Sequence, residues 1–218
     1  MKTDVIKQIK DTGVIPVVRA TSADEAMRAI DAIREGGISV LEITMTVPGA
    51  VGVIEKVCGR YGKDALVGAG TVLDPETATA CISAGARFVV SPALNFETIA
   101  CCKQHDVAVM PGALTPTEVI QAWNAGADFV KVFPAGAVGG PSYLRALKAP
   151  LPQIELIPTG GVSLKTAADF IKAGAAALGV GADLVSGPAS LITERAKQFV
   201  EIVREARNLA ADDLRLDH

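Results

Sequence analysis

Ala125-Gly126-Ala127-Asp128-Phe129-Val130-Lys131-Val132-Phe133-Pro134-Ala135 is a glycine turn followed by a run of β-branched and aromatic residues. The run predicts a buried strand over Phe129–Ala135. Side chains alternate between the faces of a strand, so Phe129, Lys131 and Phe133 share one face. Both faces are otherwise apolar, and burying an ammonium costs roughly several kcal/mol unless it is paired or neutralised. Lys131 therefore ends in a structural ion pair, reaches out at the strand end, or is a neutral amine that can act as a nucleophile.

The order of helix, glycine turn and apolar run repeats along the whole chain. Helices are predicted over Ala23–Glu35, Pro75–Ala84, Pro116–Ala125 and Leu164–Ala173, and a glycine closes each of them. Asp74 and Thr115 stand directly before helix-starting prolines, where they can cap. Apolar runs predict eight strands: Val14–Ala20, Val40–Thr46, Leu66–Val72, Phe88–Leu94, Val107–Leu114, Phe129–Ala135, Glu155–Val162 and Ala177–Val185.

Alternation of strands and helices predicts an α/β protein with a parallel sheet. Eight such units without a break in composition favour a (β/α)8 TIM barrel in one domain over residues 1–218, with an N-terminal helix over 1–12 and a frayed tail over 209–218. A doubly wound open sheet is the structural alternative. It is weakened because no G-x-G-x-x-G follows the first strand.

Composition narrows the classes of function. The net charge of -3 and the absence of a basic stripe argue against a nucleic-acid partner. No apolar run approaches the ~20 residues needed to cross a membrane. Four cysteines without a C-x-x-C pair indicate a reducing compartment, and hence a cytoplasmic location. With His105 and His218 as the only histidines, a histidine-based metal site is not expected.

Polar side chains recur at the carboxyl ends of the predicted strands, where barrel enzymes carry their active sites. Alternation places one from each of five strands on a common set of faces: Arg19, Glu42, Thr71, Lys131 and Thr159. Each also has an ordinary explanation. Glu42 can pair with Lys131 or Arg19, the threonines can bond to local backbone, and Arg19 can face solvent. Their coincidence on five strands favours a catalytic site.

Glycines follow the last two predicted strands. Gly160 and Gly161 lie in Thr159-Gly160-Gly161-Val162-Ser163, and Gly181 closes Gly179-Val180-Gly181. Free backbone N–H groups can hold an anion, and loops after strands seven and eight of barrels often bind phosphate. These glycines can also serve only as tight turns.

The chain resembles the KDPG/KHG aldolase family, the class I aldolases for 2-keto-3-deoxy-6-phosphogluconate and 4-hydroxy-2-oxoglutarate. The matching phrases run in order from about Ile9 to Val203: Val17-Val18-Arg19-Ala20, Leu41-Glu42-Ile43-Thr44, Gly68-Ala69-Gly70-Thr71-Val72, Val90-Ser91-Pro92, Met110-Pro111-Gly112, Lys131-Val132-Phe133-Pro134 and Pro158-Thr159-Gly160-Gly161-Val162. The combination is specific, although each phrase alone is weak.

The resemblance implies a (β/α)8 barrel, a homotrimer, a small 2-keto acid substrate, and no metal or other cofactor. It makes Lys131 the Schiff-base lysine and Glu42 the acid/base residue. It places Thr71, Pro92, Phe133 and Thr159 around the pyruvate-derived part of the substrate, and Gly160 and Gly161 near its phosphate.

Two positions depart from the family pattern. Many members have an arginine that contacts the substrate carboxylate four residues after the glutamate, where this chain has Thr46. We hypothesise that Arg19 supplies that charge. Many also have a serine in the phosphate loop after strand eight, where Ala182 stands here beside Asp183. Two other functions stay open: a sugar-phosphate epimerase or isomerase, and a catalytically silent oligomeric scaffold.

Overall fold

The computed structural model of the chain describes residues 1–216. Within them, helices and strands alternate along the chain. The elements are α1 Lys2–Thr12, β1 Val14–Val18, α2 Ala23–Glu35, β2 Val40–Thr44, α3 Ala50–Tyr61, the 3₁₀ helix η1 Gly62–Asp64, β3 Leu66–Gly70, α4 Pro75–Ser83, β4 Phe88–Val90, α5 Phe96–Gln104, β5 Ala108–Met110, β6 Gly112–Ala113, α6 Pro116–Asn124, β7 Val130–Val132, the 3₁₀ helix η2 Ala135–Val138, α7 Pro141–Lys148, β8 Leu156–Pro158, α8 Ala167–Lys172, β9 Leu178–Val180, α9 Ala182–Val185 and α10 Ala189–Leu216.

The strands form two parallel ladders, one of six strands in the order β5-β4-β3-β2-β1-β9 and one of three in the order β6-β7-β8. Backbone contacts connect them. Just before β7, the Asp128 N–H donates to the carbonyl of Val109 in β5 at 3.0 Å, and an isolated bridge pairs Thr159, after β8, with Gly179 of β9. The predicted α/β class and parallel strands are confirmed, and the sheet is curled.

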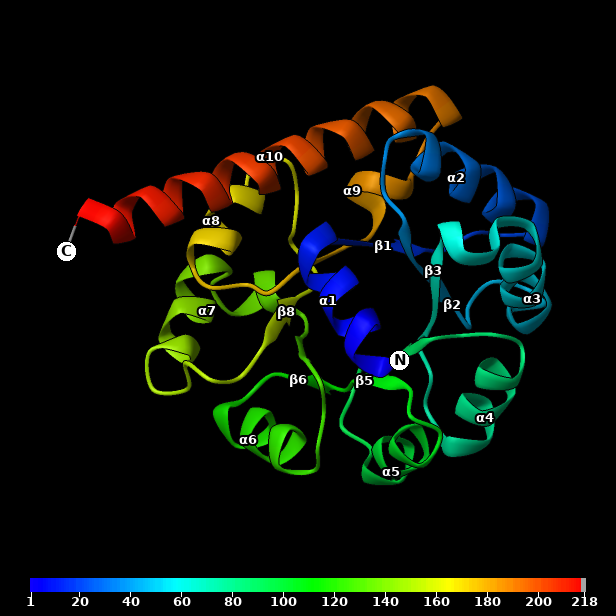
Figure 1. Ribbon diagram of the computed structural model, residues 1–218, viewed down its shortest axis with the longest axis horizontal. Helices are drawn as coiled ribbons and strands as arrows, with labels where there is room; N and C mark the ends of the chain where they lie inside the picture. Colours follow the sequence, from blue (N-terminus) through cyan, green and yellow to red (C-terminus); the bar gives the residue numbers. More distant parts are fainter. Residues whose placement is uncertain (217–218) are drawn as a thin grey trace.

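Helices surround the strands, with α10 along one side of the ring (Figure 1). The larger apolar core lies between the strands and these helices, and it contains outward residues such as Leu41, Ile43, Val130 and Val132. A second, smaller core lies on the concave side of the sheet, with Ile15, Val40, Phe88, Phe129 and Ile157 among its members. Because neighbouring strand residues divide between these two cores, every strand is buried on both faces, as expected of parallel strands.

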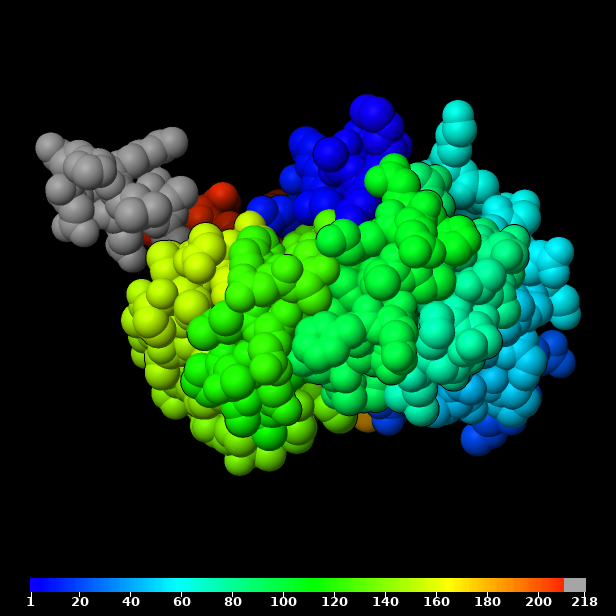
Figure 2. All heavy atoms as spheres, turned by 90° about the horizontal axis from the view of Figure 1, so that it is seen from below, coloured from blue at the N-terminus to red at the C-terminus, as the bar shows by residue number. Residues whose placement is uncertain are grey.

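The N-terminal helix α1 covers the amino ends of the strands. Its Val5 and Ile9 belong to the concave core together with Val40 and Leu66, the first residues of β2 and β3. Figure 1 shows α1 across the middle of the ring, and Figure 2 shows it, in blue, standing out from the body of the molecule. Because α1 occupies this end, the amino ends of the strands are closed to a ligand, and the carboxyl ends are the opposite side of the ring.

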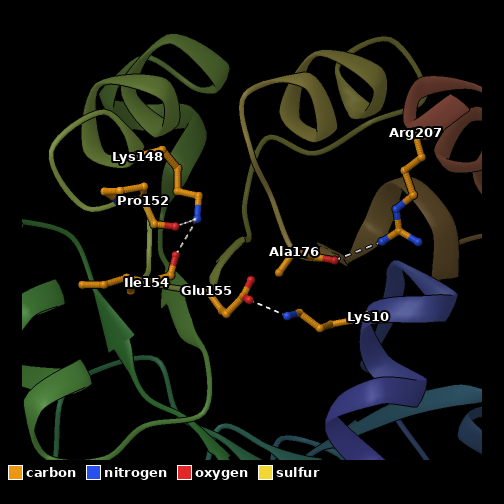
Figure 3. Close-up of polar contacts among 7 residues, drawn as sticks. All are labelled: Lys10, Lys148, Pro152, Ile154, Glu155, Ala176 and Arg207. Carbon is orange, nitrogen blue, oxygen red and sulfur yellow. Dashed lines mark hydrogen bonds and ion pairs between the residues drawn. The ribbon is translucent and has the colours of Figure 1, made fainter. Parts of the chain in front are cut away.

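Polar contacts fasten the helices at this same amino end (Figure 3). Lys10 of α1 pairs with Glu155, just before β8. The Lys148 amine, at the end of α7, donates to the carbonyls of Pro152 at 2.9 Å and Ile154 at 2.8 Å. Arg207 of α10 donates to the carbonyl of Ala176, ahead of β9, at 3.1 Å. Three helices are thereby tied to the last two strands.

The glycine turns have the predicted role. Gly85, Gly126 and Gly174 follow α4, α6 and α8 with φ of 107°, 96° and 96°, in the left-handed region. The residue after each donates back into the helix, as Ala86 N does to the carbonyl of Cys81 at 3.0 Å. This hydrogen-bond pattern satisfies the last carbonyls of each helix and sends the chain into the next strand.

Several predicted boundaries are wrong. The run Val107–Leu114 is split into β5 and β6 at Pro111, whose nitrogen carries no hydrogen for a ladder bond. The run Ala177–Val185 holds only β9, because Leu184 and Val185 donate to the carbonyl of Gly181 and form α9.

The first turn of the predicted helix Leu164–Ala173 is not helical. There the Ser163 N–H bonds to the Thr166 hydroxyl, and α8 begins at Ala167. The predicted frayed tail over 209–218 stays a prediction: α10 is drawn helical to Leu216, and 217–218 lie outside the described residues.

None of the described helices is both long and apolar enough to cross a membrane.

Candidate functional site

Three buried polar side chains lie on the concave face. Glu42 follows Val40 by two residues on β2, Lys131 follows Phe129 on β7, and Thr159 follows Ile157 at the end of β8. Their exposed fractions are 2%, 4% and 7%. Two-residue spacing keeps each on the same face as its apolar neighbour, so the strand period places all three above the concave core.

Lys131 has neither of the structural explanations that its sequence allowed. Among the ion pairs of residues 1–209, whose side chains the structure describes, it has no carboxylate partner. Its burial also shows that the amine does not reach into solvent at the strand end. The nitrogen lies 5.2 Å from the centre of the Phe133 ring, over its face. The result is a primary amine in a confined and largely apolar setting, which is the environment of a nucleophilic lysine.

Glu42 is a carboxyl group held away from water. Burial raises the pKa of Glu42, and the positive charges of Lys131 and then Arg19 lower it by less than burial raises it. Its Oε1 atom has no hydrogen-bond partner in the part of the chain that the structure describes. A carboxyl with a raised pKa and a free oxygen is suited to accept a proton and return it.

Gly70, the last residue of β3, explains how Glu42 fits. A Cβ atom added at Gly70 would lie 2.0 Å from Glu42 Oε1, far inside contact distance. The register pairs Glu42 with Gly68 and Thr44 with Gly70, which sets the glutamate side chain against this part of β3. Only glycine leaves room for the carboxyl at this position.

Arg19 follows β1 and is exposed. It lines a cavity of about 340 Å³ together with Glu25, Arg28 and residues 185–189, 192 and 29. No residue of β2 or β7 lines that cavity. The positive charge of Arg19 also lowers the pKa of the buried Glu42, so the arginine acts on the concave face as well as on this cavity.

Two threonine hydroxyls meet where β2 ends: Thr44 is its last residue, and Thr46 lies in the turn that follows. Thr44 is completely buried, and its Oγ1 donates to the carbonyl of Val18 at 3.0 Å. The exposed Thr46 places its own Oγ1 2.6 Å from that of Thr44. The exposed Thr46 is therefore connected to β1 through the buried hydroxyl of Thr44.

The predicted facing of the third strand is wrong. Val67 and Ala69 belong to the outer core, so Leu66, Gly68 and Gly70 are the concave positions. Thr71 has φ of 58° and follows the end of β3. Because its backbone is left-handed rather than extended, strand alternation does not determine where its side chain points.

The other predicted residues surround the carboxyl ends of the strands. Pro92 is half-buried, and a Cβ atom at Gly112 would lie 2.2 Å from its carbonyl carbon. Gly160 and Gly161 have φ of 82° and 80°. The carbonyl of Gly160 accepts the Gly136 N–H at 2.8 Å, so this turn packs on the loop after β7. Gly181 is half-exposed, and Ala182 is exposed at the start of α9.

Sequence reasoning selected neither Gly70 nor Thr44 as a site residue. Gly70 belongs to Gly68-Ala69-Gly70-Thr71-Val72, one of the stretches that resemble the aldolase family. Its contact with Glu42 depends on the register of β2 against β3, which the sequence does not give. Thr44 shares the Glu42 face by alternation, and that signal was available from the sequence. No group of three or more His, Cys, Asp or Glu side chains that could hold a metal occurs among the described residues.

Comparisons with known proteins identify the family. The sequence profile of the KDPG and KHG aldolase family matches residues 5–203. The 2-dehydro-3-deoxy-6-phosphogalactonate aldolase of Escherichia coli is 37% identical over 88% of this chain and 95% of its own. The 2-dehydro-3-deoxy-phosphogluconate aldolase of Treponema pallidum is 32% identical over 91% of this chain and 97% of its own.

Solved structures give the same result. A native KDPGal structure superposes with a TM-score of 0.84 at 35% identity, covering 89% of this chain and 96% of that one. A KDPG aldolase of Legionella pneumophila, with pyruvate captured as a covalent carbinolamine, has a TM-score of 0.80 at 28% identity, covering 94% and 99%. A designed cube-shaped cage built from symmetric oligomeric domains has a TM-score of 0.88 at 34% identity, covering 94% and 77%. With its profile match, its two relatives and its curled parallel sheet, the chain belongs to the KDPG and KHG aldolase family.

Proposed function

We propose that this aldolase cleaves 2-keto-3-deoxy-6-phosphogluconate to pyruvate and glyceraldehyde 3-phosphate through a Schiff base on Lys131. Membership in the family makes the chain a carbon–carbon lyase. The observation that carries the proposal is the buried Lys131 amine, which has no ion pair among the described residues and shares a face with the buried Glu42. The carbinolamine of the Legionella relative supports the same chemistry.

The amine acts first as a nucleophile. Neutral Lys131 adds to the C2 ketone, and loss of water from the carbinolamine leaves an iminium. This cation draws in the electron pair of the C3–C4 bond. The amine is buried, and its nitrogen lies 5.2 Å from the centre of the Phe133 ring, so the addition takes place in a confined site.

Glu42 moves the proton. Its carboxylate takes the C4 hydroxyl proton as C3–C4 breaks, so the aldehyde leaves and an enamine of pyruvate remains. The protonated Glu42 returns a proton to C3, and water then releases pyruvate and restores the amine. The raised pKa of Glu42 suits this alternation, because burial makes the protonated form easier to reach than in an exposed glutamate.

The remaining residues are assigned to the two ends of the substrate. We assign the carboxylate to Arg19, with Thr71, and the pyruvate-derived carbons to Pro92, Phe133 and Thr159. The phosphate is assigned to the loop amides of Gly160, Gly161, Gly181 and Ala182. Support comes from the Arg19 charge acting on Glu42, and from Gly160 and Gly161, whose left-handed turn packs against the loop after β7.

The same proposal covers the assembly. We propose one (β/α)8 barrel domain over residues 1–218, which β8 and β9 close, and which forms a cytoplasmic homotrimer that needs no cofactor. The bridge between Thr159 and Gly179 supports closure. The cage relative, built from symmetric oligomeric domains, supports oligomerisation. Four free cysteines are compatible with a reducing compartment.

Borohydride trapping tests the central step. With pyruvate present, reduction should leave a stable adduct on Lys131, located by intact mass and peptide mapping. Lys148 is an internal control, because its amine donates to two carbonyls at the opposite end of the strands (Figure 3). Glu42→Gln should keep the adduct while cleavage falls about 10²- to 10⁴-fold. No adduct on Lys131 would refute the proposal and favour the epimerase or isomerase alternative.

A further inference from the structure

The cavity of about 340 Å³ beside Arg19, called here the Arg19 cavity, lies between the loop after β1 and the turn that joins α9 to α10. The helices that flank it, α2 and α10, pack against each other (Figure 1). The buried Ala29 of α2 and Ile192 of α10 belong to its apolar lining. The loop residues to which we assign the substrate phosphate do not line this cavity: Gly160, Gly161, Gly181 and Ala182. It is therefore a separate space beside the active site.

Two arginines line the Arg19 cavity without a carboxylate partner. Arg19 comes from the loop after β1, and Arg28 comes from α2. Neither belongs to an ion pair among residues 1–209, whose side chains the structure describes. Two guanidinium groups at one cavity repel each other, and a bound anion would remove that repulsion. Because guanidinium groups bind the oxygens of carboxylates and phosphates through paired hydrogen bonds, the cavity is suited to an anion of this kind.

The charge of the lining stays positive when its carboxylate is included. Among the described residues that line the cavity, only Glu25 carries a carboxylate. Its Oε2 atom already accepts the Thr21 hydroxyl at 2.6 Å and the Thr21 N–H at 2.7 Å, and these bonds lower the pKa of Glu25. Two positive charges and one negative charge leave the lining with a net charge of +1.

A turn held by hydrogen bonds forms the opposite wall. The Arg195 guanidinium of α10 donates to the carbonyl of Ser186 at 2.7 Å. The Ile192 N–H donates to the carbonyl of Pro188 at 3.2 Å, where α10 begins with Ala189. The first N–H groups of a helix have no partner inside it, and its positive end favours an anion. This wall therefore adds the Ser186 hydroxyl and the start of a long helix to the two arginines.

We propose that the Arg19 cavity is a second anion site, which holds a phosphate group between Arg19 and Arg28. Phosphate is favoured over carboxylate because it offers more acceptor oxygens, and up to two negative charges, to donors on two sides of the cavity. The group can belong to free phosphate or to a small monoester. Under the proposed function Arg19 also binds the substrate carboxylate, so an occupied cavity should compete with the substrate for this arginine.

The test follows the backbone N–H resonances of the ¹⁵N-labelled enzyme during titration with inorganic phosphate and, separately, with glycerol 3-phosphate, at constant ionic strength. Gly187 reports on the Arg19 cavity and Gly161 on the loop assigned to the substrate phosphate. In the wild-type protein the Gly187 resonance should shift and saturate. Arg28→Gln should weaken this binding about 10- to 100-fold, the loss of a hydrogen bond between charged groups, and leave the Gly161 response unchanged. Tighter binding of glycerol 3-phosphate would identify a monoester, and equal binding would identify free phosphate.

Arg145→Gln in α7 is the matched control, because Arg145 is also exposed and does not line the cavity. It should keep both responses. Phosphate should slow trapping of Lys131 by pyruvate and borohydride more in the wild-type protein than in Arg28→Gln. The inference would be overturned by a Gly187 resonance that does not saturate, or by equal binding in wild type and Arg28→Gln. Equal slowing of trapping in these two proteins would overturn the competition for Arg19. Absence of the Lys131 adduct without phosphate would overturn the proposed function instead, whatever the titration shows.

Discussion

Replacing Gly70 with alanine should disable proton transfer while leaving the Schiff base intact. The new Cβ would lie 2.0 Å from Glu42 Oε1 and 2.6 Å from both Cδ and Cγ, whereas ordinary contact begins at 3.4 Å. To reach that distance, Glu42 Oε1 must move by about 1.4 Å. Gly70 is not among the glycines with positive φ, so alanine strains Glu42 rather than the backbone.

The expected magnitude follows from that displacement. Misplacing a catalytic group by ~1 Å can cost about 10²-fold in rate, so kcat/KM for cleavage should fall by about two orders of magnitude. Forcing a methyl into this packed region should lower the free energy of unfolding by about 1–3 kcal/mol. Lys131 is on another strand, so trapping with pyruvate and borohydride should proceed as in the wild-type protein.

Gly59→Ala in α3 is the matched control. No atom lies within 4 Å of a Cβ added there, and its φ is not positive. It should leave cleavage unchanged and stabilise the helix by up to about 1 kcal/mol. Wild-type cleavage by Gly70→Ala would refute the reasoning, and so would equal loss of cleavage and trapping, which would indicate damage to the whole site.

Two further predictions concern buried titratable groups. Because burial raises the pKa of Glu42 in the folded state, wild-type stability should fall as the pH rises from about 4.3, the ordinary value for glutamate, to the raised folded value. Urea unfolding measures the free energy of unfolding of the wild-type protein and of Glu42→Gln across this window. As the pH rises, the wild-type value should fall relative to the value of Glu42→Gln. A difference that does not change with pH would contradict the burial argument. Burial also raises the pKa of the Cys81 thiol to about 11 and that of the Cys102 thiol to about 12. Because the thiolate is the reactive form, both cysteines should resist iodoacetamide at pH 8 in the folded protein. Both should react after unfolding, as followed by mass spectrometry. Half-buried Cys101 is the internal reference, and labelling of Cys102 at the same rate would contradict its burial.

Much of the architecture could be predicted from local sequence. Glycine after a helix, proline at a helix start and short apolar runs are local signals, and they located the strand–helix units because backbone conformation is decided within a few residues. The exact strand limits could not be obtained in this way. Pro111 interrupts a run that reads as one strand, and α9 replaces the end of another, because both depend on which backbone groups find partners.

For the site, the sequence by itself determined which side chains share a strand face. The period of two in an extended strand places Glu42 with Val40, and Lys131 with Phe129, whatever the neighbouring strands are. Tertiary structure decided what alternation could not. It placed Gly70 against Glu42, turned Thr71 out of the strand pattern, and aligned Val18, Thr44 and Thr46 into one hydrogen-bonded chain. The physical reason is that register between strands and the direction of a hydroxyl hydrogen depend on residues far apart in sequence.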